Sequence, residues 1–251
     1  MIGVFDSGVG GLSSLIPLKK LLPAADILYL ADTAALPLGE KSDEEIRARI
    51  ALALAFFDGE GADAVLLACG TASSLVTDEC KAEFAFPIYD IIAPTASAAR
   101  CLSKDARILL LSTPAAARAG RFAAAFARGS HPVYTLACPA FVHMAEGRIP
   151  KAPHRIERVL APLFPLSPDV LVLGCTHFSL LKEEIALCYP EARIFDPAYC
   201  GAAAVAAHRK HADKEAGQVH FFTTGDPRPF AASASRILGH SITATKIHYP
   251  H

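Results

Sequence analysis

The chain alternates short apolar runs with longer segments in which apolar residues recur at helical spacing. Strands buried on both faces of a parallel sheet carry continuous apolar side chains, and the intervening segments have the length and period of crossover helices. We therefore predict a parallel α/β fold. The runs that we expect to form strands are 2–5, 27–31, 64–68, 108–111, 133–137, 170–173 and 219–222.

One helix start is marked directly in the sequence. Ser42 can cap the first turn of a helix, and Glu45, three residues later, can reach back to it. Apolar residues then recur at the spacing of one helix face, at Ile46, Ile50, Leu54 and Phe57.

Two segments of the chain are nearly copies of one another, 65–75 and 171–181. They place Cys69 and Cys175 at equivalent positions, 106 residues apart, each directly after an apolar run. The same offset carries 2–7 onto 108–113 and 63–65 onto 169–171. One shared register predicts two related halves, each presenting a thiol from the end of a strand. Two such thiols could approach one carbon atom from opposite faces.

From this repeat we predict two similar doubly wound parallel-sheet domains with the active site at their interface. We assign 94–204 to the second domain, with 94–100 as the bridge into it. The first domain comprises 1–93 together with 205–251, because the run at 219–222 follows the second half and can return to the first sheet.

Composition limits the possible partners. The 24 basic and 25 acidic residues give a net charge of −1, so nothing favours nucleic acid or a membrane surface, and a small polar ligand fits better. No apolar run approaches the roughly 18 residues of a membrane span, and the chain opens on a strand, so we expect a cytoplasmic protein. The seven cysteines are scattered without metal-binding spacing, which argues against disulfides and a structural metal.

Ligands of open parallel sheets bind beyond the carboxyl ends of the strands, where this chain is polar. Asp6 and Ser7 open a glycine-rich turn that is either an anion cradle or only a tight turn. Cys69 and Cys175 each precede a predicted helix, whose positive end would lower the pKa of the thiol. The remaining cysteines lack this context, and we expect them to be inert: Cys80, Cys101, Cys138, Cys188 and Cys200.

Three further side chains could act as proton partners of the two thiols. His177 and Glu146 could serve Cys175, and Asp6 could serve Cys69. Taken singly, each also has an ordinary structural interpretation, as a histidine bonded to backbone, a solvated carboxylate and a turn cap.

Six segments in order along nearly the whole chain carry a family resemblance: 5–11, 32–33 with 37–42, 68–69, 138–146, 174–177 and 221–226. Together they resemble the aspartate/glutamate racemase family, and within it the branch that acts on glutamate. Each segment alone is a weak signal, whereas their order is specific.

The resemblance implies a racemase without cofactor or metal that interconverts L- and D-glutamate, with Cys69 and Cys175 on opposite faces of the substrate Cα. It implies that Asp6 assists Cys69 and that His177 and Glu146 assist Cys175. It also implies a homodimer that supplies D-glutamate for cell-wall peptidoglycan. The substrate contacts that it implies are Asp6, Ser7, Pro37, Leu38, Gly39, Gly70, Thr71, Thr113, Thr176 and His177.

Three residues depart from the family pattern. Gly70 replaces an asparagine, Leu38 replaces a tyrosine, and Ala116 replaces a threonine. Losing hydrogen-bonding groups should weaken discrimination between substrates. The alternatives are a racemase for another amino acid such as aspartate, with Gly70 opening extra room, or a binding or regulatory homologue of low activity. If the lost amide matters, Gly70→Asn should improve the use of glutamate.

Overall fold

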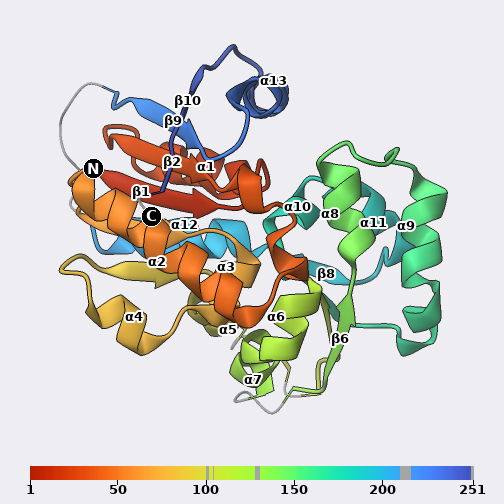
Figure 1. Cartoon of the computed structure of the whole chain (residues 1–251). Coiled ribbons are helices and arrows are strands. Elements are labelled where there is room, and N and C mark those ends of the chain that lie inside the picture. Colours follow the sequence, from red (N-terminus) through yellow and green to blue (C-terminus); the bar gives the residue numbers. More distant parts are fainter. Residues whose placement is uncertain (100–101, 104, 128–130, 210–215, 250–251) are drawn as a thin grey trace.

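The protein is seen in a computed structural model that describes residues 1–99, 102–103, 105–127, 131–209 and 216–249. Two lobes lie side by side, each built on one parallel sheet with helices around it (Figure 1). The predicted fold class, two related doubly wound α/β domains, is confirmed. No helix in the described part of the chain is both long enough and apolar enough to cross a membrane.

The first lobe contains a six-stranded parallel sheet in the order β10-β9-β2-β1-β3-β4. Two of these strands, β9 and β10, come from the end of the chain, after the second sheet is complete. The strands of this sheet are β1 (Ile2–Asp6), β2 (Ile27–Ala31), β3 (Ala64–Leu67), β4 (Ile88–Asp90), β9 (Val219–Thr223) and β10 (Ala244–Lys246).

The second lobe contains a four-stranded parallel sheet, β6-β5-β7-β8. Its strands are β5 (Ile108–Ser112), β6 (Val133–Ala137), β7 (Val170–Leu173) and β8 (Arg193–Phe195). The pairing register repeats that of the first sheet: Ile2 lies opposite Ala64, and Ile108 lies opposite Val170. The 106-residue offset therefore holds for strand pairing as well as for sequence.

Helices pack on both sheets, and α3, α6 and α10 lie near the junction of the lobes (Figure 1). The helix α12 follows the second sheet but packs against α1 and α5. The helices are α1 (Leu12–Leu21), α2 (Asp43–Gly59), α3 (Gly70–Leu75), α4 (Asp78–Ala82), α5 (Ile92–Ala98), α6 (Pro114–Ala119), α7 (Arg121–Ala127), α8 (Pro139–Ala145), α9 (Pro153–Leu160), α10 (Thr176–Ser179), α11 (Lys182–Cys188), α12 (Pro197–Ala207) and α13 (Pro227–Leu238). Short 3-10 turns are η1 (Thr33–Ala35), η2 (Leu38–Glu40) and η4 (Ala161–Leu166).

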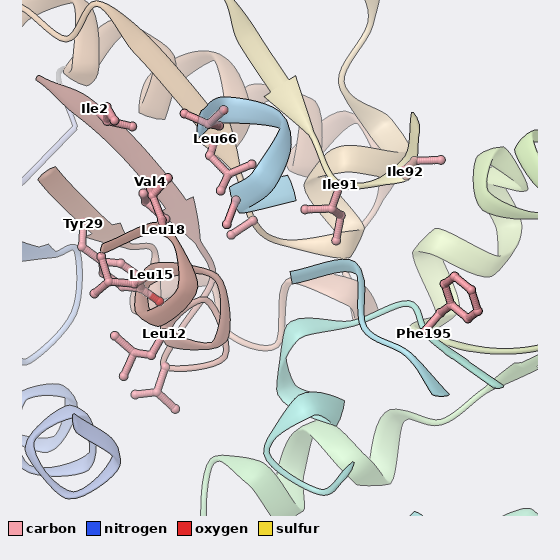
Figure 2. Packing of buried hydrophobic residues seen from close by; sticks show 14 of the residues in the cluster. Ile2, Val4, Leu12, Leu15, Leu18, Tyr29, Leu66, Ile91, Ile92 and Phe195 are labelled. Carbon is pink, nitrogen blue, oxygen red and sulfur yellow. The ribbon is translucent and has the colours of Figure 1, made fainter. Parts of the chain in front are cut away.

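The core explains why the apolar runs form strands. Every residue of β1, β2, β3, β5 and β7 is buried, as expected for strands covered on both faces. Figure 2 shows Leu12, Leu15 and Leu18 of α1 packed beside Val4 of β1. This helix is therefore fixed to the sheet directly behind the glycine-rich turn that opens it.

All seven predicted strands are present, and three strands of three residues each, β4, β8 and β10, were not predicted. The helix start at Ser42 is confirmed, because the Ser42 side chain accepts a hydrogen bond from the Glu45 N–H at 3.2 Å. The predicted bridge at 94–100 is largely helix α5, and its last residue lies outside the described part, as does Cys101. The domain boundaries stay a prediction.

Candidate active site

The two cysteine corners lie beyond the carboxyl ends of β3 and β7, the strands that pair with β1 and β5. Cys69 is the N-cap residue of α3, and Cys175 is the N-cap residue of α10. Each side chain is only 3 % exposed. The predicted placement of a thiol between strand and helix is therefore present in both lobes.

The environment of Cys69 is apolar and acidic. Its sulfur donates a long hydrogen bond to Ser7 Oγ at 3.9 Å. Burial raises the pKa of the Cys69 thiol to about 12, and the nearby charges of Asp6 and Cys175 contribute to this rise. The predicted lowering by the helix is therefore wrong here, because α3 has only six residues and the thiol is removed from water.

The environment of Cys175 contains an imidazole and a carboxylate. Its sulfur lies 3.7 Å from His177 Nδ1, and His177 Nε2 lies 2.5 Å from Glu146 Oε1. Burial alone would lower the pKa of His177, but its bonds to Cys175 and Glu146 raise that pKa well above its usual value. Burial opposes ionisation of Glu146 too, yet its bond with His177 holds the carboxyl pKa below the usual range. The three groups form a chain in which His177 can hold a proton beside the sulfur.

Asp6, at the end of β1, is fully buried and connects the lobes. One of its oxygens accepts the Gly8 N–H at 2.9 Å, and the other accepts the Thr176 hydroxyl at 2.8 Å. Burial raises the pKa of Asp6, although the charge of His177 and these bonds partly oppose the rise. Asp6 influences Cys69 through its charge, whereas the hydrogen-bond partner of Cys69 is Ser7.

Other predicted site residues meet directly across the lobes. The hydroxyls of Thr71 and Thr113 lie 2.9 Å apart, and Glu146 Oε1 accepts the Val9 N–H at 3.2 Å. Thr71, Thr113 and Thr176 are all buried. Hydroxyls that the family resemblance implies as substrate contacts thus bond to groups of the opposite lobe.

The predicted loop of Pro37, Leu38 and Gly39 lies against the second lobe as well. The turn η2 contacts α6, and a Cβ added to Gly39 would lie 2.6 Å from Thr113 Cβ. Leu38 and Ala116, two of the three departures from the family, are 1 % and 2 % exposed. Buried apolar groups therefore stand where the family has a hydroxyl.

The third departure, Gly70, does not open extra room. A Cβ built on Gly70 would collide with the carbonyl oxygen of Gly174, the residue before Cys175. Backbone from the second lobe already occupies the space that an asparagine side chain would need. This contradicts the expectation of a wider site.

Three polar contacts join the loop 36–41 to the second lobe. His143 Nε2 lies 3.2 Å from Glu40 Oε1, and Arg148 donates to the Leu36 carbonyl at 3.4 Å. Arg118 donates to the Lys41 carbonyl at 3.2 Å. These exposed contacts close the loop 36–41 onto the second lobe.

The prediction that Cys138 lacks the strand-to-helix position of Cys69 and Cys175 is wrong. It follows β6 directly, is the N-cap residue of α8, and has no exposed surface. Burial raises its pKa to about 12, with a contribution from the charge of Cys175. The 106-residue offset, which carries Asp32 onto Cys138, was the signal that could have identified this third corner.

Comparisons with known proteins agree with this geometry. A family model described as Asp/Glu/Hydantoin racemase matches residues 18–205. Glutamate racemase of Aquifex aeolicus (strain VF5) is 40 % identical over 189 residues, which are 73 % of each chain. That of Trichodesmium erythraeum (strain IMS101) is 35 % identical over 99 % of this chain and 95 % of the relative.

Solved structures match along the same length. Glutamate racemase isoform RacE1 from Bacillus anthracis superposes with a TM-score of 0.93 at 28 % identity, covering 100 % of this chain and 98 % of the other. Glutamate racemase from Francisella tularensis, solved in complex with D-glutamate, gives 0.88 at 26 % identity, with 98 % and 96 % covered. The similarity therefore includes both lobes and the junction between them.

Proposed function

The chain belongs to the Asp/Glu/hydantoin racemase family, and from this premise we propose that it interconverts L- and D-glutamate by two-base proton transfer at Cα. Cys69 and Cys175 are the two bases, one from each lobe. The observation that carries the proposal is the pair of buried thiols at register-equivalent strand ends, each with its own polar partners.

The reaction needs one thiolate and one thiol. In one direction the Cys175 thiolate removes the α-proton while the Cys69 thiol delivers a proton to the opposite face. In the other direction the two exchange roles. His177 holds a proton beside the Cys175 sulfur, and the high pKa of Cys69 keeps a proton on that sulfur for delivery. The buried surroundings exclude water from the carbanionic transition state.

The remaining buried polar groups bind the substrate. We assign the α-ammonium group to Asp6 and Ser7, and the carboxylates to Thr71, Thr113 and Thr176. The hydroxyls of Thr71 and Thr113 bond to each other in this structure, so a bound carboxylate would accept hydrogen bonds from both. Glutamate is favoured because the full-length relatives are glutamate racemases, one of them solved with D-glutamate.

The product D-glutamate would supply peptidoglycan synthesis, the use that the family resemblance implies. The cytoplasmic location and the homodimer remain part of this proposal.

The test is incubation with L- and with D-glutamate in heavy water, following both optical inversion and deuterium at Cα. The wild type should invert either enantiomer and incorporate deuterium from solvent. Cys69→Ala and Cys175→Ala should each lower racemisation by at least about 10³-fold, because each removes a reacting group. Full activity in either variant would refute the two-base assignment.

A racemase for aspartate is the second candidate, favoured by the apolar Leu38 and Ala116 in place of hydrogen-bonding groups. A panel of amino acids in the same assay separates the two, since an aspartate enzyme would incorporate deuterium into aspartate faster. A binding protein without turnover would show no exchange with any of them.

A further inference from the structure

Glycines of the first lobe face the second lobe along the junction. At each of them a side chain would meet a residue of the opposite lobe: Gly8 meets Glu146, Gly10 meets Thr176 and His177, Gly39 meets Thr113, and Gly70 meets Gly174. These neighbours include most of the polar groups that the second lobe contributes to the candidate site. The lobes can lie this close only because the first lobe lacks side chains there.

Gly70 differs from Gly8 and Gly39 in what lies opposite. At Gly8 the obstacle is the end of the flexible Glu146 side chain, which can rotate away, and at Gly39 it is the side chain of Thr113. At Gly70 it is backbone: an added Cβ would come nearer than 3.0 Å to the Gly174 carbonyl oxygen, 3.0 Å from its carbon and 3.4 Å from Cys175 Cα. Real Cβ atoms essentially never approach other atoms that closely.

Neither backbone can move aside independently of its lobe. The N–H of Ala68 donates to the Phe5 carbonyl at 2.9 Å, which fixes the first corner to β1. The N–H of Gly174 donates to the Leu111 carbonyl at 2.8 Å, which fixes the second corner to β5. Any side chain at position 70 must therefore be accommodated by separating the two lobes.

We propose that Gly70 is a positioning residue that sets the separation between the Cys69 and Cys175 thiols. This inference rests on the two-base function proposed above. The residues in contact, Gly70 and Gly174, are the direct chain neighbours of the two cysteines, so a displacement there passes to both sulfurs. A displacement of about 1 Å at a reacting centre can cost about 10²-fold in rate.

Holding the two lobes apart should change the reaction in a way that a general loss of structure would not. Removing the α-proton needs one thiol, whereas inversion needs both thiols at the same carbon. When the lobes are held apart, a proton removed by one thiol exchanges with solvent and returns from the same side. Exchange with retention of configuration should therefore rise relative to inversion.

The experiment compares Gly70→Ala with Gly59→Ala in heavy water, using L- and D-glutamate separately. Gly59 is an exposed helix residue, and a Cβ added there would meet nothing within 4 Å. In Gly70→Ala, inversion should fall about 10- to 100-fold while the ratio of retained exchange to inversion increases at least about fivefold. Gly59→Ala should keep both rates within about twofold of wild type.

Three results would overturn the inference: inversion at the wild-type rate in Gly70→Ala, equal loss of exchange and inversion, or faster glutamate turnover in Gly70→Asn. Absence of exchange in the wild type would instead refute the proposed function. A readout that needs no variant is crosslinking of the wild type with bifunctional methanethiosulfonates of increasing length, followed by peptide mapping. The shortest reagents should join Cys69 to Cys175, and a requirement for long reagents would contradict two thiols that flank one carbon atom.

Discussion

The Cys69 and Cys175 corners occupy equivalent positions in the two sheets and differ in their chemistry. Both follow strands of equivalent register, both precede a short helix, and both thiols are buried. Cys69 has a hydroxyl, that of Ser7, as its bonding partner, whereas Cys175 has the imidazole of His177. The internal repeat thus places two sulfurs symmetrically and surrounds them unequally.

The asymmetry arises because the residue types of the proton partners are not copied, although His177 and Asp6 lie within the repeated segments. The 106-residue offset carries Thr71 onto His177 and Asp6 onto Ser112, so neither partner has a counterpart of its own kind. Glu146 comes from the end of α8, beyond the strand ends that the repeat aligns. Under the proposed two-base mechanism, the two directions of the reaction therefore rely on different groups.

Among the substitutions that test the difference between the two corners, replacing His177 should have the largest effect on activity. Glutamine keeps hydrogen-bonding capacity but cannot carry a proton, so His177→Gln should lower racemisation about 10²- to 10⁴-fold. In heavy water only the enantiomer deprotonated by Cys175 should lose exchange at Cα, whereas its mirror image should still exchange through Cys69. Nuclear magnetic resonance of each glutamate enantiomer measures the two rates separately.

The matched control for this variant is His154→Gln, at an exposed position of α9, which should leave both exchange rates unchanged. Equal loss of exchange in the two enantiomers would mean that His177 serves both thiols. The two thiols would then not act through separate proton partners.

Glu146→Gln should have an intermediate effect, visible in its pH dependence. Although burial opposes it, the Glu146 carboxylate helps to raise the pKa of His177, so the variant should lower that pKa. The alkaline limb of the kcat/KM profile should move to lower pH, with about a tenfold loss on that limb. Glu157→Gln, on the exposed face of α9, is the control. If the alkaline limb does not shift, Glu146 does not influence the protonation of His177.

The same pair predicts how stability varies with pH. Because the folded pKa of His177 lies above its ordinary value of 6.5, its contribution is complete below pH 6.5 and is lost as pH rises through the folded pKa. The Glu146 pKa is depressed, so its contribution is complete above its ordinary value of 4.5 and is lost as pH falls through the folded pKa. Thermal unfolding should therefore show the largest deficit of Glu146→Gln between pH 4.5 and 6.5.

The features of the fold that could be predicted from the sequence are those that the internal repeat and the hydrophobic periodicity determine. The offset between Cys69 and Cys175 identified the two sheets, and the continuous apolar runs located seven strands. Strands of three residues, such as β4, carry too few side chains to show a period. Glu146 was predicted to assist Cys175 together with His177. Its bond to His177, 31 residues along the chain, spans a distance that local patterns do not cover.

Two errors share one physical cause. The pKa of Cys69 rises instead of falling, because burial depends on how the lobes close and not on the residues beside the thiol. Gly70 suggested open space for the same reason: the Gly174 backbone that fills it lies in the other lobe. The local sequence predicts the residues of each corner well, but it does not show which atoms of the opposite lobe lie against that corner.

The smallest effect expected concerns the third buried thiol, Cys138, which lies near Cys175 but bonds only to the Leu136 carbonyl, at 3.7 Å, among the hydrogen bonds described. Cys138→Ala removes one buried sulfur and should cost about 1 kcal/mol of unfolding free energy, as for a methyl-sized deletion. Racemisation should stay within about twofold of wild type, because no proton path through Cys138 is needed. Chemical denaturation and the heavy-water assay measure the two quantities on one preparation. A loss of turnover comparable to that of Cys175→Ala would show that the chemistry uses three corners, and the contrast between two would no longer describe the site.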